Sequence, residues 1–273
     1  LSVFTLVMIN IIAVDSIRAL PISAEYGLSL IFYYVLGAVL FMIPSALAAA
    51  EMSTGWPQTG GIYVWVREAF GVKIAFFVSW LLWIYNIVWY PTILSLIAST
   101  FFYIFDPVFA TNKEYVFVAI LVTYFLATFV NCFGMRASGM ISTFCTIFGT
   151  LIPIALMIIL GIVWLARGNQ VAIDLKWGNI IPDISNIRQL AILTGMLFGM
   201  VGMEMSAIHA QDVENPSKDY PKALLISTIV ILLSSIFGAL AIAIIIPQQS
   251  LNLSSAVIES FGIFFNKYHI PWM

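Results

Sequence analysis

One carboxyl group stands inside a strongly apolar stretch of the chain. Glu204 follows Arg188 after only 15 uncharged residues, in a segment that continues to about Gln211 and also carries His209. An acidic side chain in apolar surroundings is costly to keep, so it is a functional candidate by default. The pattern predicts a gating or proton-sensing role for Glu204 and His209. The alternatives are a structural carboxyl group bonded to nearby backbone, and an ordinary core or interfacial histidine.

A second polar cluster interrupts the first apolar segment, which runs from Leu1 to about Leu20. The cluster consists of Asp15, Ser16, Ile17 and Arg18. Asp15 and Arg18 are three residues apart, so they can pair on a helix and neutralise each other. The alternative is a substrate site in which Arg18 attracts a carboxylate and Asp15 an amino group.

Glycines loosen the segment that carries Glu204. Freed backbone groups at residues 199–203 could bind an ammonium group through carbonyls or a carboxylate through N–H groups. The alternative is close helix packing, because Gly195 and Gly199 form a G-x-x-x-G pattern. The predicted contacts with a substrate are Gly199, Met200, Gly202 and Met203.

The composition excludes most classes of soluble protein. Hydrophobic residues make up 62% of the chain, mean hydropathy is +1.04, and charged residues make up 9%, against roughly 25% in soluble domains. A net charge of −2 provides no basic face for nucleic acid. Cys132 and Cys145 lie in apolar stretches and form no disulfide framework or metal motif. The chain is predicted to be an all-α polytopic membrane protein without a cofactor, metal or nucleic-acid partner.

Five charge-free stretches are long enough for membrane-spanning helices, which need about 20 apolar residues. They lie between Glu25 and Glu51, Lys73 and Asp106, Glu114 and Arg136, Arg136 and Arg167, and Lys222 and Glu259. With the two defective segments at the first and sixth places, this predicts about seven transmembrane helices. We expect helices 1 and 6 to be broken at residues 14–18 and 199–203 and to lie side by side. A short interfacial helix is expected over residues 62–70.

Two defective segments five helices apart are typical of transporters built from two inverted five-helix repeats. In such proteins the first helix of each repeat is broken at mid-membrane, where it lines a cavity. The pattern predicts a single transmembrane domain over residues 1–273, with a first repeat at about 1–167. A second repeat would start at about 188 and fill the rest of the chain. Three further helices would then be missing, so we expect a truncated part of a larger bundle.

Two motifs resemble those of the amino-acid/polyamine/organocation permeases. The stretch Glu51–Trp65 has an acidic end to helix 2 followed by a Pro-x-x-Gly-Gly-x-Tyr loop. Gly202–His209 with Glu214–Pro221 is similar to helix 6 and the following loop of the bacterial glutamate/γ-aminobutyrate antiporters. The resemblance implies a LeuT-type inverted-repeat fold in the bacterial inner membrane, with a cytoplasmic N-terminus. Lysine and arginine do not orient the chain, because they divide evenly between the two sides.

The resemblance also implies that Phe198 closes over the substrate and that Glu204 belongs to a proton-sensitive network. Trp89 and Tyr90 stand in an aromatic stretch of helix 3, where they are expected to pack or to wall the cavity. The chain departs from the family at the break in helix 1, because residues 14–18 contain no glycine. The substrate therefore stays undefined beyond an amino acid.

The function predicted from these features is secondary transport of amino acids by alternating access, with glutamate/γ-aminobutyrate-like exchange as the first hypothesis. A proton-coupled symporter is the alternative. A polytopic membrane enzyme is a rival of another class, but His209 and His269 lie on different segments rather than together at one interface. A channel is the other rival, and nothing in the sequence repeats as a selectivity filter. The expected partners are an amino acid and the lipid bilayer, and a homodimer stays open.

Overall fold

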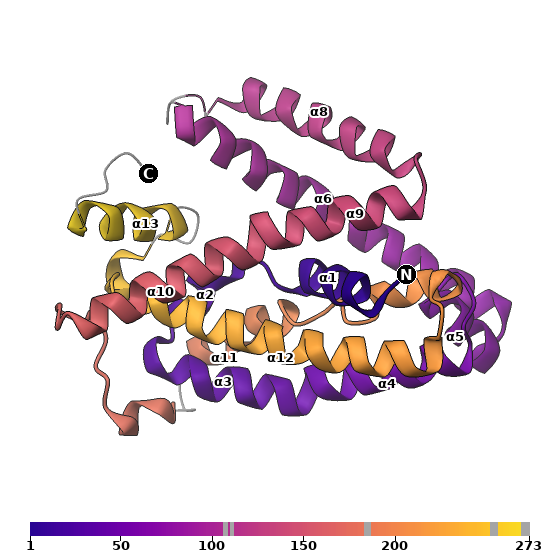
Figure 1. Ribbon diagram of the computed structural model, residues 1–273, viewed down its shortest axis with the longest axis horizontal. Coiled ribbons are helices and arrows are strands. Elements are labelled where there is room, and N and C mark those ends of the chain that lie inside the picture. Colours follow the sequence, from indigo (N-terminus) through magenta and orange to yellow (C-terminus); the bar gives the residue numbers. More distant parts are fainter. Residues whose placement is uncertain (106–108, 110–111, 183–186, 252–255, 269–273) are drawn as a thin grey trace. The chain divides into compact units, whose positions relative to one another are not determined.

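The computed structural model describes residues 1–105, 109, 112–182, 187–251 and 256–268 (Figure 1). Every regular element of these residues is helical, which confirms the predicted all-α class. Contacts divide the chain into two compact units. The first contains residues 1–59 and 142–273, and the second contains residues 60–141.

Five helical segments are long and apolar enough to cross a membrane. They cover Gly27–Gly55, Val72–Phe102, Lys113–Asn131, Ala137–Ala166 and Pro216–Ala243. Each of the five contains most of one charge-free stretch of the sequence, and the charged residues that they include lie near their ends. Charge is costly in the hydrocarbon core of the membrane, so it is kept out of the middle of a span. The prediction of these five spans is confirmed.

The first and sixth segments are interrupted as expected. Helix 1 consists of α1 (Val3–Val14) and α2 (Ala19–Ala24), joined by four non-helical residues. Helix 6 consists of α11 (Ile187–Phe198) and a 3-10 segment, η5 (Met205–Asp212). The predicted breaks at 14–18 and 199–203 are therefore confirmed to within one or two residues.

Two of the spans contain a π-helical turn just before a proline. In helix 2, the turn η2 (Ala38–Met42) separates α3 (Leu30–Gly37) from α4 (Ile43–Gly55), which carries Pro44. In helix 5, the turn η3 (Thr146–Leu151) separates α9 (Met135–Cys145) from α10 (Ile152–Ala166), which carries Pro153. Proline has no N–H and crowds the carbonyl four residues earlier, so the helix widens there.

The helix α12 (Pro216–Ala243) is the common neighbour of the elements of the first unit. It packs against α1, α2, α3, α4 and α10, and it also contacts α13 (Ala256–Lys267) (Figure 1). Its approach to α10 is close, since a Cβ atom at Gly161 would lie 3.0 Å from the Cβ atom of Ala241. Small residues at such a crossing let two membrane helices approach closely.

The second unit consists of α5 (Ile62–Phe70), α6 (Val72–Phe105) and α8 (Lys113–Asn131). The bounds of α5 agree with the interfacial helix expected over residues 62–70. α6 contacts both α5 and α8, and it stays helical through Pro91. The Asn112 side chain caps α8 by accepting a hydrogen bond of 3.0 Å from the Glu114 N–H.

Candidate functional site

The break in helix 1 begins at Asp15, whose backbone is extended with φ −78° and ψ 112°. Its N–H still donates to the Ile11 carbonyl at 2.7 Å, and α2 then starts at Ala19. Pro21 explains why the helix does not continue. A proline cannot donate to the carbonyl of Ile17 and would clash with it, but it is tolerated in the first turn of a new helix.

The break in helix 6 begins where α11 ends at Phe198. Gly199 and Met200 still donate to carbonyls of α11, and η5 then begins with the Met205 N–H donating to the Gly202 carbonyl at 3.0 Å. Gly202 has φ +124°, a backbone conformation that side chains with a Cβ atom rarely adopt. The glycine therefore allows the chain to leave the helical conformation between α11 and η5.

The two breaks lie against each other. A Cβ atom at Gly202 would lie 3.2 Å from the Ala13 carbonyl oxygen, and one at Gly199 would lie 3.8 Å from the Cβ atom of Ala19. α1 also contacts η5, and α2 contacts α11. The expectation that helices 1 and 6 are neighbours is therefore confirmed.

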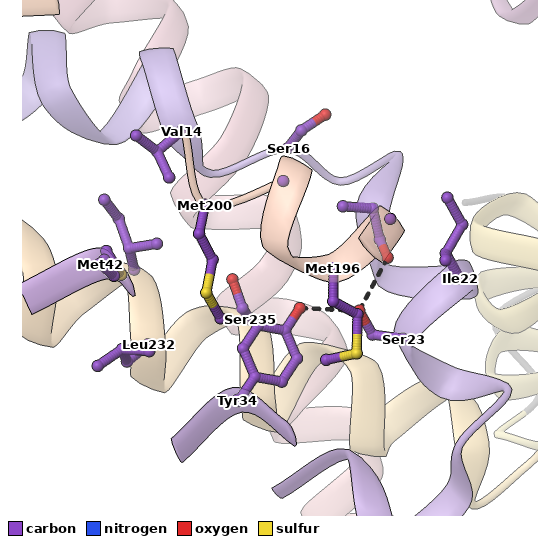
Figure 2. A pocket seen from close by; sticks show the side chains of 14 residues that line it. Val14, Ser16, Ile22, Ser23, Tyr34, Met42, Met196, Met200, Leu232 and Ser235 are labelled. Carbon is purple, nitrogen blue, oxygen red and sulfur yellow. Dashed lines mark hydrogen bonds between the residues drawn. The ribbon is translucent and has the colours of Figure 1, made fainter. Parts of the chain in front are cut away.

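A small cavity of about 20 Å³ lies beside the two breaks (Figure 2). That volume holds about one water molecule. Four helical segments supply its walls. The lining residues are Val14, Ser16, Ala19, Ile22 and Ser23 of helix 1, Gly195, Met196, Gly199 and Met200 of helix 6, Tyr34 and Met42 of helix 2, and Ile231, Leu232 and Ser235 of α12.

Hydroxyl groups gather on one side of this cavity. The Tyr34 hydroxyl lies 2.8 Å from the Ser23 Oγ, and Ser23 donates to the Ala19 carbonyl at 3.2 Å (Figure 2). Because a serine hydroxyl has one proton, Tyr34 is the donor of the first bond when Ser23 makes the second. Ser235 adds a third hydroxyl to the wall. Met42, Met196 and Met200 also line the cavity, and their flexible side chains adapt to the shape of their neighbours.

Asp15 lies directly behind this wall. Its side chain is 4% exposed, and it accepts hydrogen bonds from the Ser234 and Ser235 hydroxyls of α12. Arg18 is exposed, and no ion pair joins it to Asp15, although the structure describes both side chains. The expected pairing within helix 1 is therefore not observed, because the extended backbone at Asp15 turns its carboxylate toward α12.

The structure brings together only part of the predicted substrate site. Ser16, Gly199 and Met200 line the cavity. The other candidates in helices 1 and 6 lie near it without lining it. Gly202 and Met203 are buried, Ile17 and Glu204 are half-buried, and Arg18 and Phe198 are exposed.

Three further candidates stay predictions. Trp89 and Tyr90 belong to the second unit, where their rings pack edge to face with centroids 5.5 Å apart. The backbone of His209 lies in η5, but its side chain is outside the described part of the structure.

The contributions of helix 2 and α12 were not predicted from the sequence. Tyr34 of helix 2 and Ser235 of α12 supply hydroxyls beside that of Ser23 in helix 1, and Met42 of helix 2 also lines the cavity. One signal was available, since Ser234 and Ser235 form a hydroxyl pair within an otherwise apolar stretch. The hydroxyl of a membrane serine commonly bonds its own helix, so the pair alone does not indicate a site.

A wider, open cavity of about 650 Å³ lies over the loops of the first unit. Its walls come from residues 26–29, from residues 172–174, 178, 179, 181 and 182, and from residues 247–249, and the exposed surface of these walls is mainly polar. Burial raises the pKa of the Tyr26 phenol above its usual value, so this wall residue is neutral at physiological pH. Asp174 on the rim pairs with Lys176 at 3.1 Å, with both side chains largely exposed.

A family model described as amino acid permease matches residues 1–273. The chain belongs to the amino acid permease family. An uncharacterized transporter of Legionella pneumophila is 49% identical over this whole chain, which covers 59% of that protein. A glutamate/gamma-aminobutyrate antiporter of Lactococcus lactis is 28% identical over the whole chain, with 55% of its length covered. A probable agmatine/putrescine antiporter of the same species is 25% identical over 96% of the chain, again with 55% covered.

The family confirms the predicted resemblance and the all-helical, polytopic membrane class. The permease is an integral membrane protein with several spans, and its bacterial relatives indicate the inner, or plasma, membrane. The chain spans just over half the length of the curated relatives it matches. These relatives are transporters rather than enzymes, in agreement with the non-enzymatic role expected from the sequence.

Proposed function

We propose that the chain is part of a secondary amino-acid transporter that works as an antiporter by alternating access. The observation that carries the proposal is the cavity between the broken helices 1 and 6, in a chain that belongs to the amino acid permeases. Broken helices expose backbone groups only where they line a cavity, and such breaks are typical substrate sites in transporters.

The chemistry of the cavity suits a small zwitterion. The hydroxyls of Ser16, Ser23, Tyr34 and Ser235 offer hydrogen bonds to polar groups. Backbone carbonyls at the end of α11 suit an ammonium group, because carbonyl groups at a helix C-terminus carry partial negative charge. Apolar side chains complete the cavity and suit the aliphatic part of an amino acid.

The cavity is too small for an amino acid in this conformation. Since about 20 Å³ holds roughly one water molecule, the walls must separate before a substrate enters. Met196, Met200 and Met42 are the side chains best able to move, because methionine is unbranched and flexible. A site that closes almost completely supports alternating access rather than a continuous channel.

The names of two relatives favour exchange over symport. One exchanges glutamate and gamma-aminobutyrate and another is a probable agmatine/putrescine antiporter. We therefore take glutamate/gamma-aminobutyrate exchange as the first reaction to test. With a cytoplasmic N-terminus, the wide polar cavity over residues 26–29, 172–182 and 247–249 would face the outside.

The test is exchange by the full-length protein in liposomes. Liposomes loaded with unlabelled glutamate should take up labelled glutamate or γ-aminobutyrate, and liposomes without internal substrate should take up little. Uptake that needs no internal amino acid but follows a proton gradient would replace antiport with symport. Flux that neither saturates nor needs a counter-substrate would indicate a channel.

Filling the cavity should block exchange. Gly195 lines the cavity and has only Ile22 near the position of a Cβ atom, at 3.9 Å. Leucine is a good helix former, so Gly195→Leu should leave α11 intact. Its side chain would project into the cavity and exclude the substrate, so exchange should be lost. Gly262→Leu is the matched control, because that glycine lies in α13 with no atom within 4 Å of a new Cβ. An equal loss of exchange in both variants would show that this cavity is not the substrate site.

A further inference from the structure

We propose that Asp15 is a proton-binding site of the transport cycle, with the Ser234 and Ser235 hydroxyls as its hydrogen-bonding partners. The inference rests on the proposed transport function and adds that a proton moves together with the amino acid. Asp15 is buried, accepts hydrogen bonds from both serines, and stands between the cavity-lining residues Val14 and Ser16 at the break in helix 1. No other acidic side chain is fully buried among the residues whose side chains the structure describes.

The surroundings of Asp15 contain no compensating charge within the described residues. α12 carries Lys218, Asp219 and Lys222 near its start, at least 12 residues before Ser234, or about 18 Å along a helix. The neighbouring turn η3 has no charged residue, and Tyr34 is the titratable group that faces Asp15 from helix 2. Glu204 and Asp212 flank or end η5, and because both are acidic they cannot compensate the charge of Asp15. The buried carboxylate of Asp15 therefore has hydroxyl donors but no cation beside it. When it binds a proton, the unpaired charge is removed from the interior.

The serine geometry accommodates both charge states of Asp15. When Asp15 is ionised, the Ser234 hydroxyl donates to its carboxylate. The same Ser234 Oγ also lies 2.8 Å from the Val230 carbonyl oxygen. Once a proton forms an O–H bond on Asp15, that group can donate to the Ser234 Oγ, while Ser234 turns its single proton to Val230. Both states are satisfied without movement of any heavy atom.

The proton can reach Asp15 from the cavity. Ser235 lines the cavity and its Oγ lies 3.3 Å from Asp15 Oδ1, so it connects water in the cavity with the carboxylate. Hydronium in the cavity would transfer its proton to Asp15 and leave water. Release on the other side of the membrane would return the carboxylate.

Protonation has a mechanical consequence for helix 1. A hydrogen bond to an ionised group is roughly twice as strong as one between neutral groups. The ionised Asp15 therefore ties the break in helix 1 firmly to α12, and the neutral form loosens that tie. Alternating access would need helix 1 to move against its neighbours, and the break is the place where the weaker hydrogen bond to α12 would allow this movement.

The first experiment needs no transport. Infrared difference spectra of the purified full-length protein, recorded between about pH 8 and about pH 4, should show the C=O band of a buried carboxylic acid growing as pH falls. The band should be lost in Asp15→Asn and kept in Asp174→Asn, which changes an exposed aspartate of an outer loop. The same band in Asp15→Asn would overturn the proposal. If Asp15→Asn does not fold, Asp15→Glu serves instead, and an unshifted band in that variant would also overturn it.

The second experiment measures coupling in liposomes that contain a pH-sensitive dye. Substrate added to the wild-type protein should move protons, and Asp15→Asn should move none. Its amino-acid exchange, measured in parallel, should be reduced, because the neutral side chain holds helix 1 only in the loosened form. Ser234→Ala removes a donor to the ionised form, so the pH midpoint of transport should shift upward. Proton movement that survives in Asp15→Asn, or transport that follows sodium instead of pH, would refute the proton site. A wild-type protein that carries no amino acid would instead refute the transport function, and the infrared result would still stand.

Discussion

At the scale of single residues, the contact between the two breaks depends on the absence of side chains. Gly202 faces the Ala13 carbonyl at a distance at which a methyl group would already press on the backbone. Its φ of +124° adds a conformational requirement that glycine alone satisfies without strain. Asp15 contributes in the opposite way, through its side chain, because its carboxylate forms the hydrogen bonds that join helix 1 to α12.

We expect Gly202→Ala to destabilise the protein by about 1–3 kcal/mol, the usual cost of a residue forced into a glycine-only conformation. The new methyl group would also press on Ala13 and separate helices 1 and 6, so exchange should fall. Thermal unfolding in detergent measures the first effect and liposome exchange the second. Gly262→Ala is the control, since α13 leaves open space there. A Gly202→Ala protein as stable as this control would contradict the role given to the turn.

At the scale of elements, the π-helical turns show how proline shapes two spans without breaking them. Both turns precede a proline in the second position of the following helix. In helix 5 the widened turn places Thr146 beside α1, where its hydroxyl lies 3.1 Å from the Met8 carbonyl oxygen. The same hydroxyl lies 2.7 Å from the Ser142 carbonyl oxygen, within its own helix. A local irregularity thus creates a contact between helices 5 and 1.

Thr146→Val tests this contact. The substitution keeps the side-chain shape and removes the hydroxyl, so we expect a loss of about 0.5–1.5 kcal/mol in the free energy of unfolding. Thr123→Val is a matched control, because Thr123 bonds only the Ala119 carbonyl within α8 among the contacts described, at 2.8 Å. Chemical denaturation of both variants in detergent provides the comparison. Equal losses would mean that the bond from helix 5 to helix 1 adds nothing to stability.

At the scale of the whole molecule, the sequence predicted the elements better than the site. Charge-free stretches identify five spans because the bilayer penalises charge at every position of a helix. Asp15 indicated the first break for the same reason, whereas the glycines near residue 200 indicated the second because glycine weakens a helix. Pro21 would have placed the first break more closely, since a proline disfavours a helix that continues from Val3 through its position.

The site was harder to predict because its walls are chemically ordinary. Met42, Met196 and Ile231 do not differ in type from the many apolar residues that face lipid. Hydrophobic periodicity separates core from surface in water, but in a membrane both faces of a helix are apolar. Tyr34 and Ser235 become a site only through the contacts among helices 1, 2 and α12, which spacing along the chain does not encode.

The closed cavity predicts how residues react from outside the membrane. In a protein whose exposed Cys132 and Cys145 are replaced by alanine, Gln248→Cys should react quickly with a membrane-impermeant thiol reagent. Ser16→Cys should react slowly at rest, since a space of about 20 Å³ admits no reagent. Added substrate should speed its labelling as the walls open and close. Equal rates at the two positions without substrate would show that the cavity is open at rest.

The partners of Asp15 also set an order of events during synthesis. The Ser234 hydroxyl stands 219 residues after the carboxylate it bonds, so at about 5–20 residues per second a ribosome needs roughly 10 to 45 s to supply it. Throughout that interval helix 1 carries an acidic residue into the membrane before α12 exists. The first helix therefore receives its final position only after the seventh has been inserted, and assembly of the substrate cavity is a late step in the biogenesis of the protein.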